Sequence, residues 1–435
     1  MTEVQPVPAA VELALLEPAG GVPQVLSNAS EIESAARALA GGTGPVAIDA
    51  ERASGYRYGQ RAYLVQLKRE GAGSFLIDPI NLDHLRSVHD ALEGTEWILH
   101  AASQDLPCLR ELDMSPSSLF DTELAGRIAG KARVGLGPLV EEVLGLRLEK
   151  GHGAADWSTR PLPAPWLRYA VLDVEVLIEL RHALAKDLED QGKTQWAQEE
   201  FEAIVNAPPA EPRVDPWRRV SGLHRVRQSQ QLAIVRQLWQ TRDEIAQQRD
   251  IAPGRILQDI AIVEAALAAP KTEAELIVLD GFKGKGAQRN TRKWLGAVNA
   301  ALQLSAQQWP APSVPSDSPP PARAWPERDK SAALRLAAAR HVVTELGERH
   351  SIPVENLLTP DYLRRLCWTP PWSNDDEPDA QAADEFLTTW GARPWQRNLT
   401  VEAICSAIAT ASRTGQAPQP LPSPSSQPDG QSAPE

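Results

Sequence analysis

The chain of 435 residues carries a formal net charge of −13, and 42% of its residues are hydrophobic and 23% charged. It is too long for a single hydrophobic core, so about three domains are expected, and its composition is that of a soluble globular protein. No apolar run approaches the roughly 20 residues that cross a bilayer, and no secretory signal is expected, so we predict no membrane partner. Three scattered cysteines, Cys108, Cys367 and Cys405, favour a cytoplasmic location and argue against a structural zinc site.

The charge is distributed unevenly along the chain. Residues 212–305 contain 15 Lys and Arg against 9 Asp and Glu, whereas residues 326–413 contain 10 against 13. Residues 1–211 carry a balance of −14. Because nucleic acids are held by basic surfaces, the acidic average argues against nucleic-acid binding, but the basic middle segment favours it.

The first part of the chain predicts an α/β domain over residues 26–211, after an extended arm at 1–25. A helix over Glu31–Ala40, with Ser30 as its N-cap, precedes three closely spaced strand patterns that favour an antiparallel meander. Helix and strand patterns then alternate, which adds further strands and makes the sheet mixed. The strands are predicted at residues 46–50, 62–68, 74–78, 97–101 and 119–120, and the later helices at 82–93, from about 104, at 123–128 and at 138–144.

The rest of the chain is predicted to be helical. Residues 212–305 show helical periodicity at 228–248, 255–268, 272–279 and 289–303. A Pro-rich linker at 306–325 separates them from another helical domain at 326–413, and a disordered tail is expected at 414–435. At an offset of 100 residues, Pro253 and Pro353 each follow an amphipathic helix, so the third domain is predicted to be a diverged copy of the second.

Asp49 and Glu51 end the first strand pattern, Pro45-Val-Ala-Ile-Asp-Ala-Glu51. Successive side chains of a strand point to opposite faces, so the two carboxylates share one face. Two like charges this close either lie in solvent at a strand end or bind a strongly positive group, such as a divalent cation with oxygen ligands.

Asp105 follows the strand pattern at 97–101, in a strand-to-helix turn where Ser103 is the expected N-cap. A carboxylate in the first turn of a helix is stabilised by the helix dipole, which is a sufficient structural reason for this residue. The turn also lies at the C-terminal end of a predicted parallel strand, where α/β sheets bind ligands. Both interpretations stay open for this motif alone.

Tyr169 and Asp173 are four residues apart in a helical segment and share one helix face. Apolar residues flank Asp173, and an unpaired carboxylate among them would cost on the order of several kcal/mol or take up a proton. Asp173 therefore needs a partner, which is either Tyr169 within a polar network of the core or a metal ion with the phenol beside it.

Together these residues resemble the ribonuclease D family of 3′→5′ exonucleases, which belong to the DEDD superfamily with a tyrosine in the last motif. The resemblance covers residues 44 to about 185 and rests on Asp49-x-Glu51, Asp105 and Tyr169-x-x-x-Asp173, supported by Tyr63-Leu-Val-Gln66-Leu, Phe120-Asp-Thr and Asp156-Trp157-Ser-Thr-Arg160-Pro-Leu. Pro216-Trp217, Arg242-Asp-Glu and Asp250-Ile-Ala-Pro253 are similar to an HRDC domain, the helical nucleic-acid-binding module of this family. The resemblance implies a ribonuclease H-like exonuclease domain with a mixed sheet, followed by two all-α HRDC or HRDC-like domains.

The resemblance also implies hydrolysis of RNA from its 3′ end with two Mg²⁺ or Mn²⁺ ions held by the four carboxylates. Asp49 would bridge both ions, Glu51 and Asp173 would serve the ion on the side of the attacking water, and Asp105 would serve the other. Tyr169 would orient this water, because a phenol with an unperturbed pKa of about 10 is a poor general base at neutral pH. The implied partner is RNA with a free 3′ end, such as a tRNA precursor or another structured RNA.

Basic residues near these motifs are candidates for contact with the nucleic acid. Lys150, His152 and Arg160 could contact phosphates, although such residues are more often solvated surface, and Trp157 is expected to pack rather than to stack on a base. In the middle domain, the predicted RNA-contact patch consists of Lys283, Lys285, Arg289, Arg292 and Lys293. Two alternatives stay open, a DNA exonuclease of the same superfamily and a catalytically silent RNA-binding protein.

Overall fold

The computed structural model describes residues 17–149, 151–313 and 317–416. Contacts divide the chain into two compact units, one of residues 1–122, 135–183 and 202–315, and one of residues 123–134, 184–201 and 316–435. Most of the predicted arm at 1–25 and of the predicted tail at 414–435 lies outside the described residues. Among the helices of the described ranges, none combines the length and apolarity that crossing a membrane requires.

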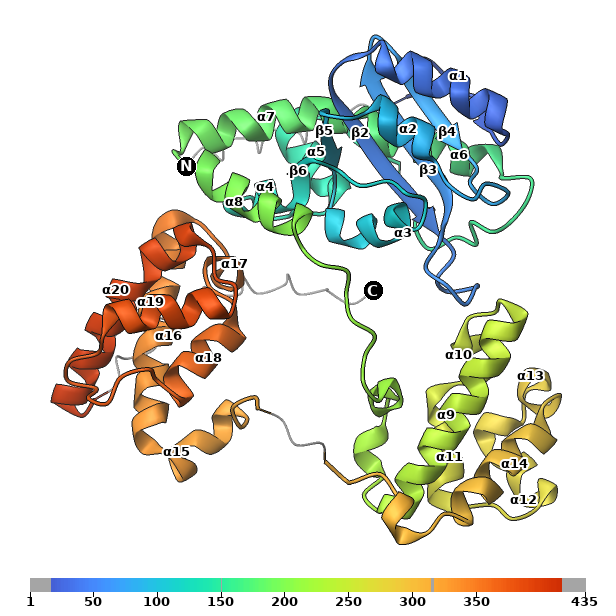
Figure 1. Ribbon diagram of the computed structural model, residues 1–435, viewed down its shortest axis with the longest axis vertical. Coiled ribbons are helices and arrows are strands. Elements are labelled where there is room, and N and C mark those ends of the chain that lie inside the picture. Colours follow the sequence, from blue (N-terminus) through green and yellow to red (C-terminus); the bar gives the residue numbers. More distant parts are fainter. Residues whose placement is uncertain (1–16, 150, 314–316, 417–435) are drawn as a thin grey trace, which may run out of the picture. The chain divides into compact units, whose positions relative to one another are not determined.

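A six-stranded mixed sheet forms the centre of the first unit, with the strand order β1-β4-β3-β2-β5-β6 (Figure 1). β2, β3 and β4 pair antiparallel, and β5 and β6 continue the sheet in parallel beside β2, which confirms the predicted mixed sheet. The edge strand β1 pairs parallel with β4 and is missing from the prediction, because two residues cannot show a period. The strands span Val25–Leu26 (β1), Thr43–Arg52 (β2), Ala62–Glu70 (β3), Gly73–Ile77 (β4), Glu96–Leu99 (β5) and Ser118–Asp121 (β6).

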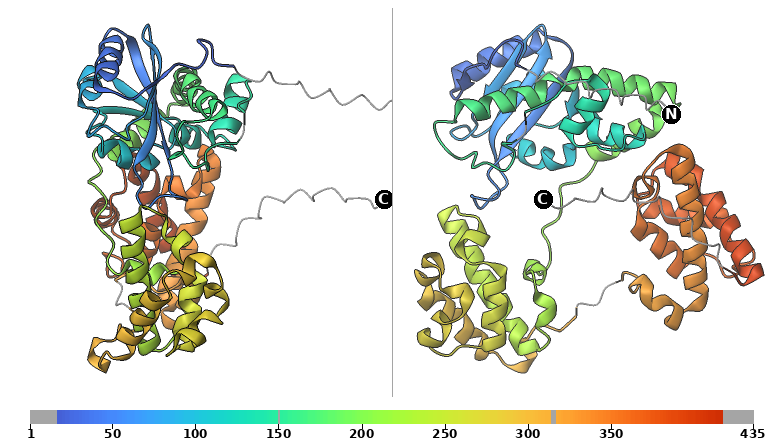
Figure 2. Two further views of the ribbon diagram at one scale, coloured as in Figure 1. Left: turned by 90° about the vertical axis from the view of Figure 1, so that its right-hand side faces the viewer. Right: turned by 180° about the vertical axis from the view of Figure 1, so that it is seen from behind.

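Helices cover both faces of this sheet. α1 (Ala29–Ala40) packs against α2 (Arg86–Ala91) on one face, and α6 (Ala164–Glu175) packs against β2, β3 and β4 on the opposite face (Figure 2). The other helices of this part of the sequence are η1 (Ala102–Gln104), α3 (Leu106–Arg110), α4 (Thr122–Ile128), α5 (Leu136–Leu144), α7 (Leu177–Asp190) and α8 (Thr194–Val205).

The core beneath α6 is apolar. Leu64 and Leu76 of the strands and Ala170 and Val171 of α6 are buried together with Trp157. Trp157 is fully buried, and its indole N–H donates a hydrogen bond to a backbone carbonyl at 3.1 Å. The expectation that Trp157 packs in the core is therefore confirmed.

The predicted start of α1 is wrong by two residues. Asn28, and not Ser30, is the N-cap, and its side-chain oxygen accepts a hydrogen bond from the backbone N–H of Glu31 at 3.1 Å. The Glu31 carboxylate accepts in turn from the backbone N–H of Ser27 at 2.8 Å. Asn is as good an N-cap as Ser, so the sequence alone does not separate the two positions.

The helical part of the first unit has a core of its own, centred on Trp294 and Phe282, both of which are almost completely buried. The predicted single helix at 255–268 is two helices, because Leu257 adopts an extended backbone with φ of −155° and ends the first of them. The elements here are η2 (Pro216–Arg219), η3 (Leu223–Arg225), α9 (Ser229–Arg249), α10 (Pro253–Ile256), α11 (Asp259–Ala268), α12 (Glu273–Ile277), η4 (Asp280–Phe282), α13 (Lys285–Gln288), α14 (Thr291–Leu302) and η5 (Ala306–Gln308).

The loop that joins β2 to β3 contacts this helical part of the same unit. The Tyr58 hydroxyl donates a hydrogen bond to Asp243 of α9 at 3.1 Å. Arg255 of α10 donates to the Gly55 carbonyl at 2.7 Å, and its guanidinium lies 4.1 Å from the ring centroid of Tyr56. The segment that follows Glu51 is thus bonded to two helices more than 180 residues further along the chain.

The second unit joins the C-terminal helices to two segments from the first half of the sequence. Trp196 of α8 stacks on Trp395 of α20 with the ring centroids 5.3 Å apart. Lys193, only 4% exposed, donates hydrogen bonds to the carbonyls of Ile128 at 2.8 Å and His350 at 2.6 Å. The C-terminal helices are η6 (Ala322–Ala324), α15 (Trp325–Arg328), α16 (Lys330–His350), α17 (Val354–Leu357), α18 (Pro360–Trp368), α19 (Ala380–Thr389) and α20 (Pro394–Thr414).

The two segments of the predicted internal repeat have similar backbones, whereas their common origin stays a prediction. α9 and α16 each have 21 residues, and each is followed by a residue with positive φ, 49° at Asp250 and 52° at Ser351. Each then leads into a four-residue helix that starts at or directly after a proline, Pro253 or Pro353. Both copies therefore use the same left-handed turn and proline to reverse the chain.

Candidate active site

β2 carries Asp49 and Glu51 on the face of the sheet that α6 covers. In the antiparallel pairing with β3, Asp49 lies opposite Gln66 and Glu51 lies opposite Leu64, which belongs to the core beneath α6. Val46, Ala47 and Ile48 just before them are fully buried. These residues fix the register, because a slip of one residue would turn both carboxylates to the other face.

α6 brings Tyr169 and Asp173 to the same place. Its apolar residues Ala170 and Val171 pack onto the strands, which leaves Tyr169 and Asp173, one turn apart, directed at the end of β2. The Tyr169 hydroxyl forms a hydrogen bond with the Asp173 carboxyl group. The ring of His152 meets the Tyr169 ring edge-on, with the centroids 5.7 Å apart.

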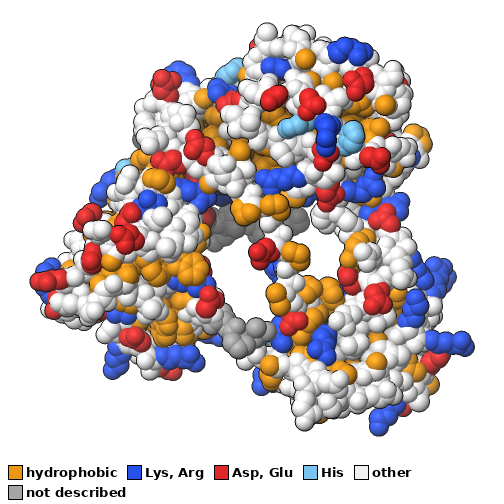
Figure 3. Space-filling model, viewed as in Figure 1, with side chains coloured by type: hydrophobic (Ala, Val, Ile, Leu, Met, Phe, Trp, Pro, Cys, Tyr) orange, Lys and Arg blue, Asp and Glu red, His pale blue; other side chains and the backbone are white. Residues whose placement is uncertain are grey.

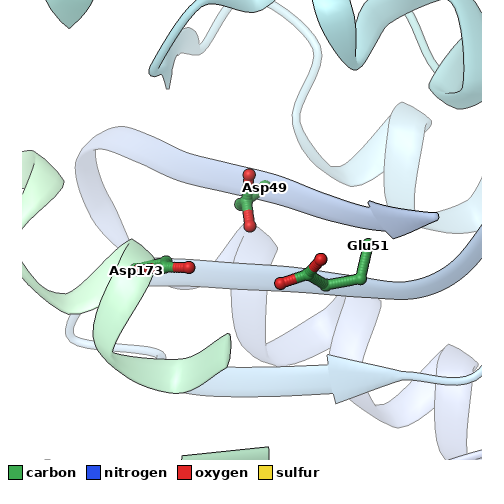
Figure 4. A group of neighbouring side chains, drawn as sticks. All are labelled: Asp49, Glu51 and Asp173. Carbon is green, nitrogen blue, oxygen red and sulfur yellow. The ribbon is translucent and has the colours of Figure 1, made fainter. Parts of the chain in front are cut away.

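The carboxyl groups of Asp49, Glu51 and Asp173 converge. Each offers one oxygen, and these oxygens all lie within 4.8 Å of one another. Figure 4 shows Asp49 and Glu51 on the strand and Asp173 on the helix with their carboxyl groups turned toward one another. A set of carboxylate oxygens with neither nitrogen nor sulfur suits Mg²⁺, Mn²⁺ or Ca²⁺.

The electrostatics show how strongly these carboxyl groups resist joint ionisation. Burial raises the pKa of Glu51 to about 10, helped by the charges of Asp49, Asp173 and Asp105. Burial also raises the pKa of Asp49 to about 6 and that of Asp173 well above its ordinary value. A bound divalent cation would reverse these shifts, because it stabilises the charged form of each ligand.

Asp105 lies beside this cluster but is not one of the three converging groups. It is buried, and its carboxylate forms an ion pair with Arg52 at 3.4 Å. Its pKa is raised to about 8, first by burial and then by the charge of Asp49, which Arg52 opposes. The predicted Ser103 cap is wrong, since the turn begins with the three-residue helix η1 and Asp105 itself precedes α3 without making a side-chain cap bond. Asp105 still lies at the N-terminus of α3, so stabilisation by the helix dipole stays open beside the metal-ligand interpretation.

Arg52 is a feature that the sequence patterns miss. By strict alternation it would point away from Asp49 and Glu51, but the pairing of β2 with β3 shifts register between Glu51 and Arg52. Such an irregularity turns a side chain from its regular direction, and here the guanidinium reaches Asp105. The available signal was an arginine directly after Asp-x-Glu.

The three basic residues predicted before α6 have different surroundings. Lys150 lies outside the described residues. His152 lies among the rings of Trp166 and Tyr169 at the edge of the cluster. The guanidinium of Arg160 donates to both carboxylate oxygens of Asp78 at 2.6 and 2.9 Å and to three backbone carbonyls. These bonds give Arg160 a structural task, and its contact with phosphate stays a prediction.

The five basic residues predicted in the helical part are all exposed and lie on α13 and α14 or next to α13. Figure 3 shows Lys and Arg side chains along the side of this part that carries α13. Lys283 is paired with Asp280, and Arg292 with Glu273 at 3.6 Å. RNA contact by this surface stays a prediction.

The fold and the carboxylate cluster together define the class of 3′–5′ exonucleases. A family model described as "3'-5' exonuclease" matches residues 23–189, one described as "HRDC domain" matches 231–298, and one described as "3' to 5' exonuclease C-terminal domain" matches 318–408. The chain is 32% identical to Ribonuclease D of Zymomonas mobilis over 276 residues, 61% of this chain and 69% of that protein. It is 31% identical to Ribonuclease D of a Shewanella species over 311 residues, 69% of this chain and 75% of that protein. The chain therefore belongs to the ribonuclease D family, is a 3′–5′ exoribonuclease, and acts on RNA.

Solved structures share the fold of this chain. A protein from Bifidobacterium adolescentis superposes with a TM-score of 0.83 at 39% identity, covering 91% of this chain and all of that one. RNase D of Escherichia coli superposes with a TM-score of 0.63 at 23% identity, covering 85% of this chain and 99% of that one, and shows the fold alone. The exonuclease and HRDC predictions and the predicted fold class are confirmed.

Proposed function

We propose that this exoribonuclease hydrolyses RNA by a two-metal-ion mechanism, with Asp49, Glu51, Asp105 and Asp173 as the metal ligands. The observation that carries the proposal is the convergence of three carboxyl groups within 4.8 Å. Asp105, whose pKa is raised in part by the charge of Asp49, is the proposed ligand of the second ion. The donor set consists of oxygens only, which fits Mg²⁺ or Mn²⁺.

Each side chain has a task that follows from its place. Divalent cations at this cluster would supply positive charge for the attacking water and for the leaving 3′-oxygen. Asp49, whose charge acts on Glu51, Asp173 and Asp105, would help to hold both ions, and Glu51 and Asp173 would hold the ion that activates the water. The pKa of Tyr169 is raised by burial and by the charge of Asp173, so the phenol keeps its proton at neutral pH and orients the water instead of deprotonating it.

We propose the 3′ ends of structured RNA, tRNA precursors among them, as substrates. The Escherichia coli protein with the same fold is described as "an exoribonuclease involved in structured RNA processing". The exposed basic residues on and beside α13 and α14 support the proposal, because they are candidates for phosphate contact in a chain whose first 211 residues carry −14. We propose a cytoplasmic location, since Cys108, Cys367 and Cys405 are all free thiols.

The experiment is an assay of 3′-end shortening on RNA labelled at its 5′ end. With Mg²⁺ or Mn²⁺ the wild-type protein should shorten the RNA stepwise, and Asp49→Asn should reduce the rate by at least about 10³-fold, because a bridging carboxylate cannot be replaced by an amide. Full activity in EDTA, or an unimpaired Asp49→Asn variant, would refute the two-metal mechanism.

The substrate proposal has a separate test. A tRNA precursor with a 3′ extension, an unstructured RNA of the same length and a DNA of the same sequence are compared under single-turnover conditions. We expect the extension to be trimmed back to the structured stem and the DNA to react more slowly. Equal rates on RNA and DNA would support a broader nuclease, and a preference for unstructured RNA would overturn the proposed substrate.

A further inference from the structure

Gln66 of β3 is a polar side chain in one of the most apolar places of the protein. It is 0% exposed, and neither its amide nitrogen nor its carbonyl oxygen has a hydrogen-bond partner among the described residues. Such a carboxamide has two N–H donors and an oxygen acceptor, and leaving them unpaired in the core is unfavourable. Natural cores rarely keep such a group without a use.

The position of Gln66 points to that use. It lies directly opposite Asp49 in the antiparallel pair of β2 and β3, so both side chains lie on the same face of the sheet. On its other side it lies opposite Leu76 of β4, which is apolar and buried. α6, which carries Tyr169 and Asp173, covers this face by packing on β2, β3 and β4. The carboxamide therefore lies in the layer that contains the carboxylate cluster.

The surroundings leave few other partners. β3 is paired along both of its edges, with β2 and with β4, so the backbone groups of these strands are engaged in the sheet. The backbone of α6 is bonded within the helix. Of the other polar groups on this face, Lys68 and Ser74 are already bonded to Glu175 of α6. The cluster offers Asp49, which lies opposite Gln66 in the strand pairing, and Tyr169 and Asp173 of α6.

We infer that Gln66 is a positioning residue of the active site. When Asp49, Glu51 and Asp173 hold a divalent cation, the Gln66 carboxamide forms hydrogen bonds that orient these ligands. This inference rests on the proposed metal mechanism. A side chain that orients ligands in this way costs stability in the metal-free protein and contributes to affinity for the metal. The two effects have opposite signs, which separates this role from packing.

The test measures Mn²⁺ binding by calorimetry or electron paramagnetic resonance, together with the melting temperature in EDTA. Gln66→Met keeps the length of the side chain and removes the amide. We expect its Mn²⁺ affinity to fall about tenfold or more, with a melting temperature in EDTA equal to or above that of the wild type. Leu64→Met is the matched control. Leu64 is buried on the same strand and the same face as Gln66, and it pairs with Glu51 across the two strands. The Mn²⁺ affinity of the Leu64→Met variant should be unchanged.

A second variant, Gln66→Glu, keeps the test decisive if Gln66→Met does not fold. An added carboxylate beside the cluster should lower the melting temperature in EDTA and enlarge the upward shift that Mn²⁺ produces. Mn²⁺ affinity of Gln66→Met equal to that of the control, or an unchanged shift in Gln66→Glu, overturns the inference. The Asp49→Asn variant separates the two proposals. If Asp49→Asn binds Mn²⁺ as tightly as the wild type, the proposed metal site is wrong. If Asp49→Asn loses Mn²⁺ binding but the Gln66 variants do not, only the role of Gln66 is wrong.

Discussion

Glu51 shows what the carboxylate cluster costs the protein when no cation is bound. The pKa of Glu51 is about 10, that of Asp49 is about 6 and that of Asp105 is about 8. All three lie above the pKa near 4 that a carboxyl group has in an unfolded chain. A carboxyl group with a raised pKa binds more protons in the folded state than in the unfolded state. The folded state therefore loses stability as the pH rises from the unfolded pKa through the folded one.

We expect the melting temperature in EDTA to fall from roughly pH 5 to roughly pH 9. Mg²⁺ should restore most of the loss at the upper end, because it offsets the charges that burial and mutual repulsion disfavour. Differential scanning calorimetry across this range, with and without Mg²⁺, measures the effect. Asp49→Asn should show a shallower fall, since it removes one of the interacting charges, and a melting temperature in EDTA that does not change with pH would contradict the prediction.

Much of the candidate site can be predicted from the sequence, because its residues are spaced at the regular periods of a strand or a helix. Asp49 and Glu51 share a strand face, and Tyr169 and Asp173 share a helix face, and the structure brings three of the four carboxylates together. The roles of Arg52 and Gln66 cannot be predicted from such spacing. The direction of Arg52 depends on a local irregularity of β2, and the isolation of Gln66 depends on what lies above and beside it in the folded sheet.

At the scale of elements, the long and strongly periodic segments are the ones that the sequence predicts well. β2, β3, β4, α9 and α16 lie where expected, within a few residues at their ends. The shortest elements are missed or misplaced, because β1 has two residues and the split between α10 and α11 depends on the backbone of Leu257. The packing of α8 against the C-terminal helices is also beyond prediction, since no periodic pattern connects residues 200 positions apart.

Lys193 provides a prediction at this scale. Its buried ammonium donates to the carbonyl of Ile128 at the end of α4 and to that of His350 at the end of α16, and burial lowers its pKa. Lys193→Met should destabilise the second unit by about 2–4 kcal/mol, because two buried carbonyls lose their donor and two helix ends lose a positive charge. Urea denaturation measures the change in the free energy of unfolding.

Lys186 is the matched control for this experiment. It lies on the preceding helix α7, is largely exposed, and pairs with Asp190 at 2.5 Å. Lys186→Met should leave the unfolding curve unchanged, since exposed ion pairs contribute little. If both variants unfold alike, the bonds of Lys193 do not hold these helices together.

For the molecule as a whole, the distribution of charge predicts how RNA is held. Residues 1–211 carry −14, which disfavours the approach of a polyanion, so we expect the basic surface of α13 and α14 to contribute much of the affinity for RNA. Replacing Lys285, Arg289 and Lys293 by Gln should raise KM with little change in kcat, because these residues are not part of the carboxylate cluster. The slope of log affinity against log salt concentration should become shallower by about 2.

Lys283 and Arg292 serve as the comparison in the same domain. Their charges are already paired with Asp280 and Glu273. Replacing Lys283 and Arg292 by Gln should change the slope of log affinity against log salt concentration. For each residue replaced, this change should be smaller than the change in the triple variant. An unchanged salt dependence in the triple variant would show that RNA is held by another surface.

The repeated backbone of α9–α10 and α16–α17 has an evolutionary consequence. The segment that contains the first copy carries +6, and the segment that contains the second carries −3, although the helix lengths, the left-handed turn and the proline are the same. Surface charge is thus free to change sign in this scaffold, because buried apolar residues and turn geometry maintain its fold. After a duplication, one copy can keep a basic surface while the other exchanges it for an acidic one, without either copy having to fold anew.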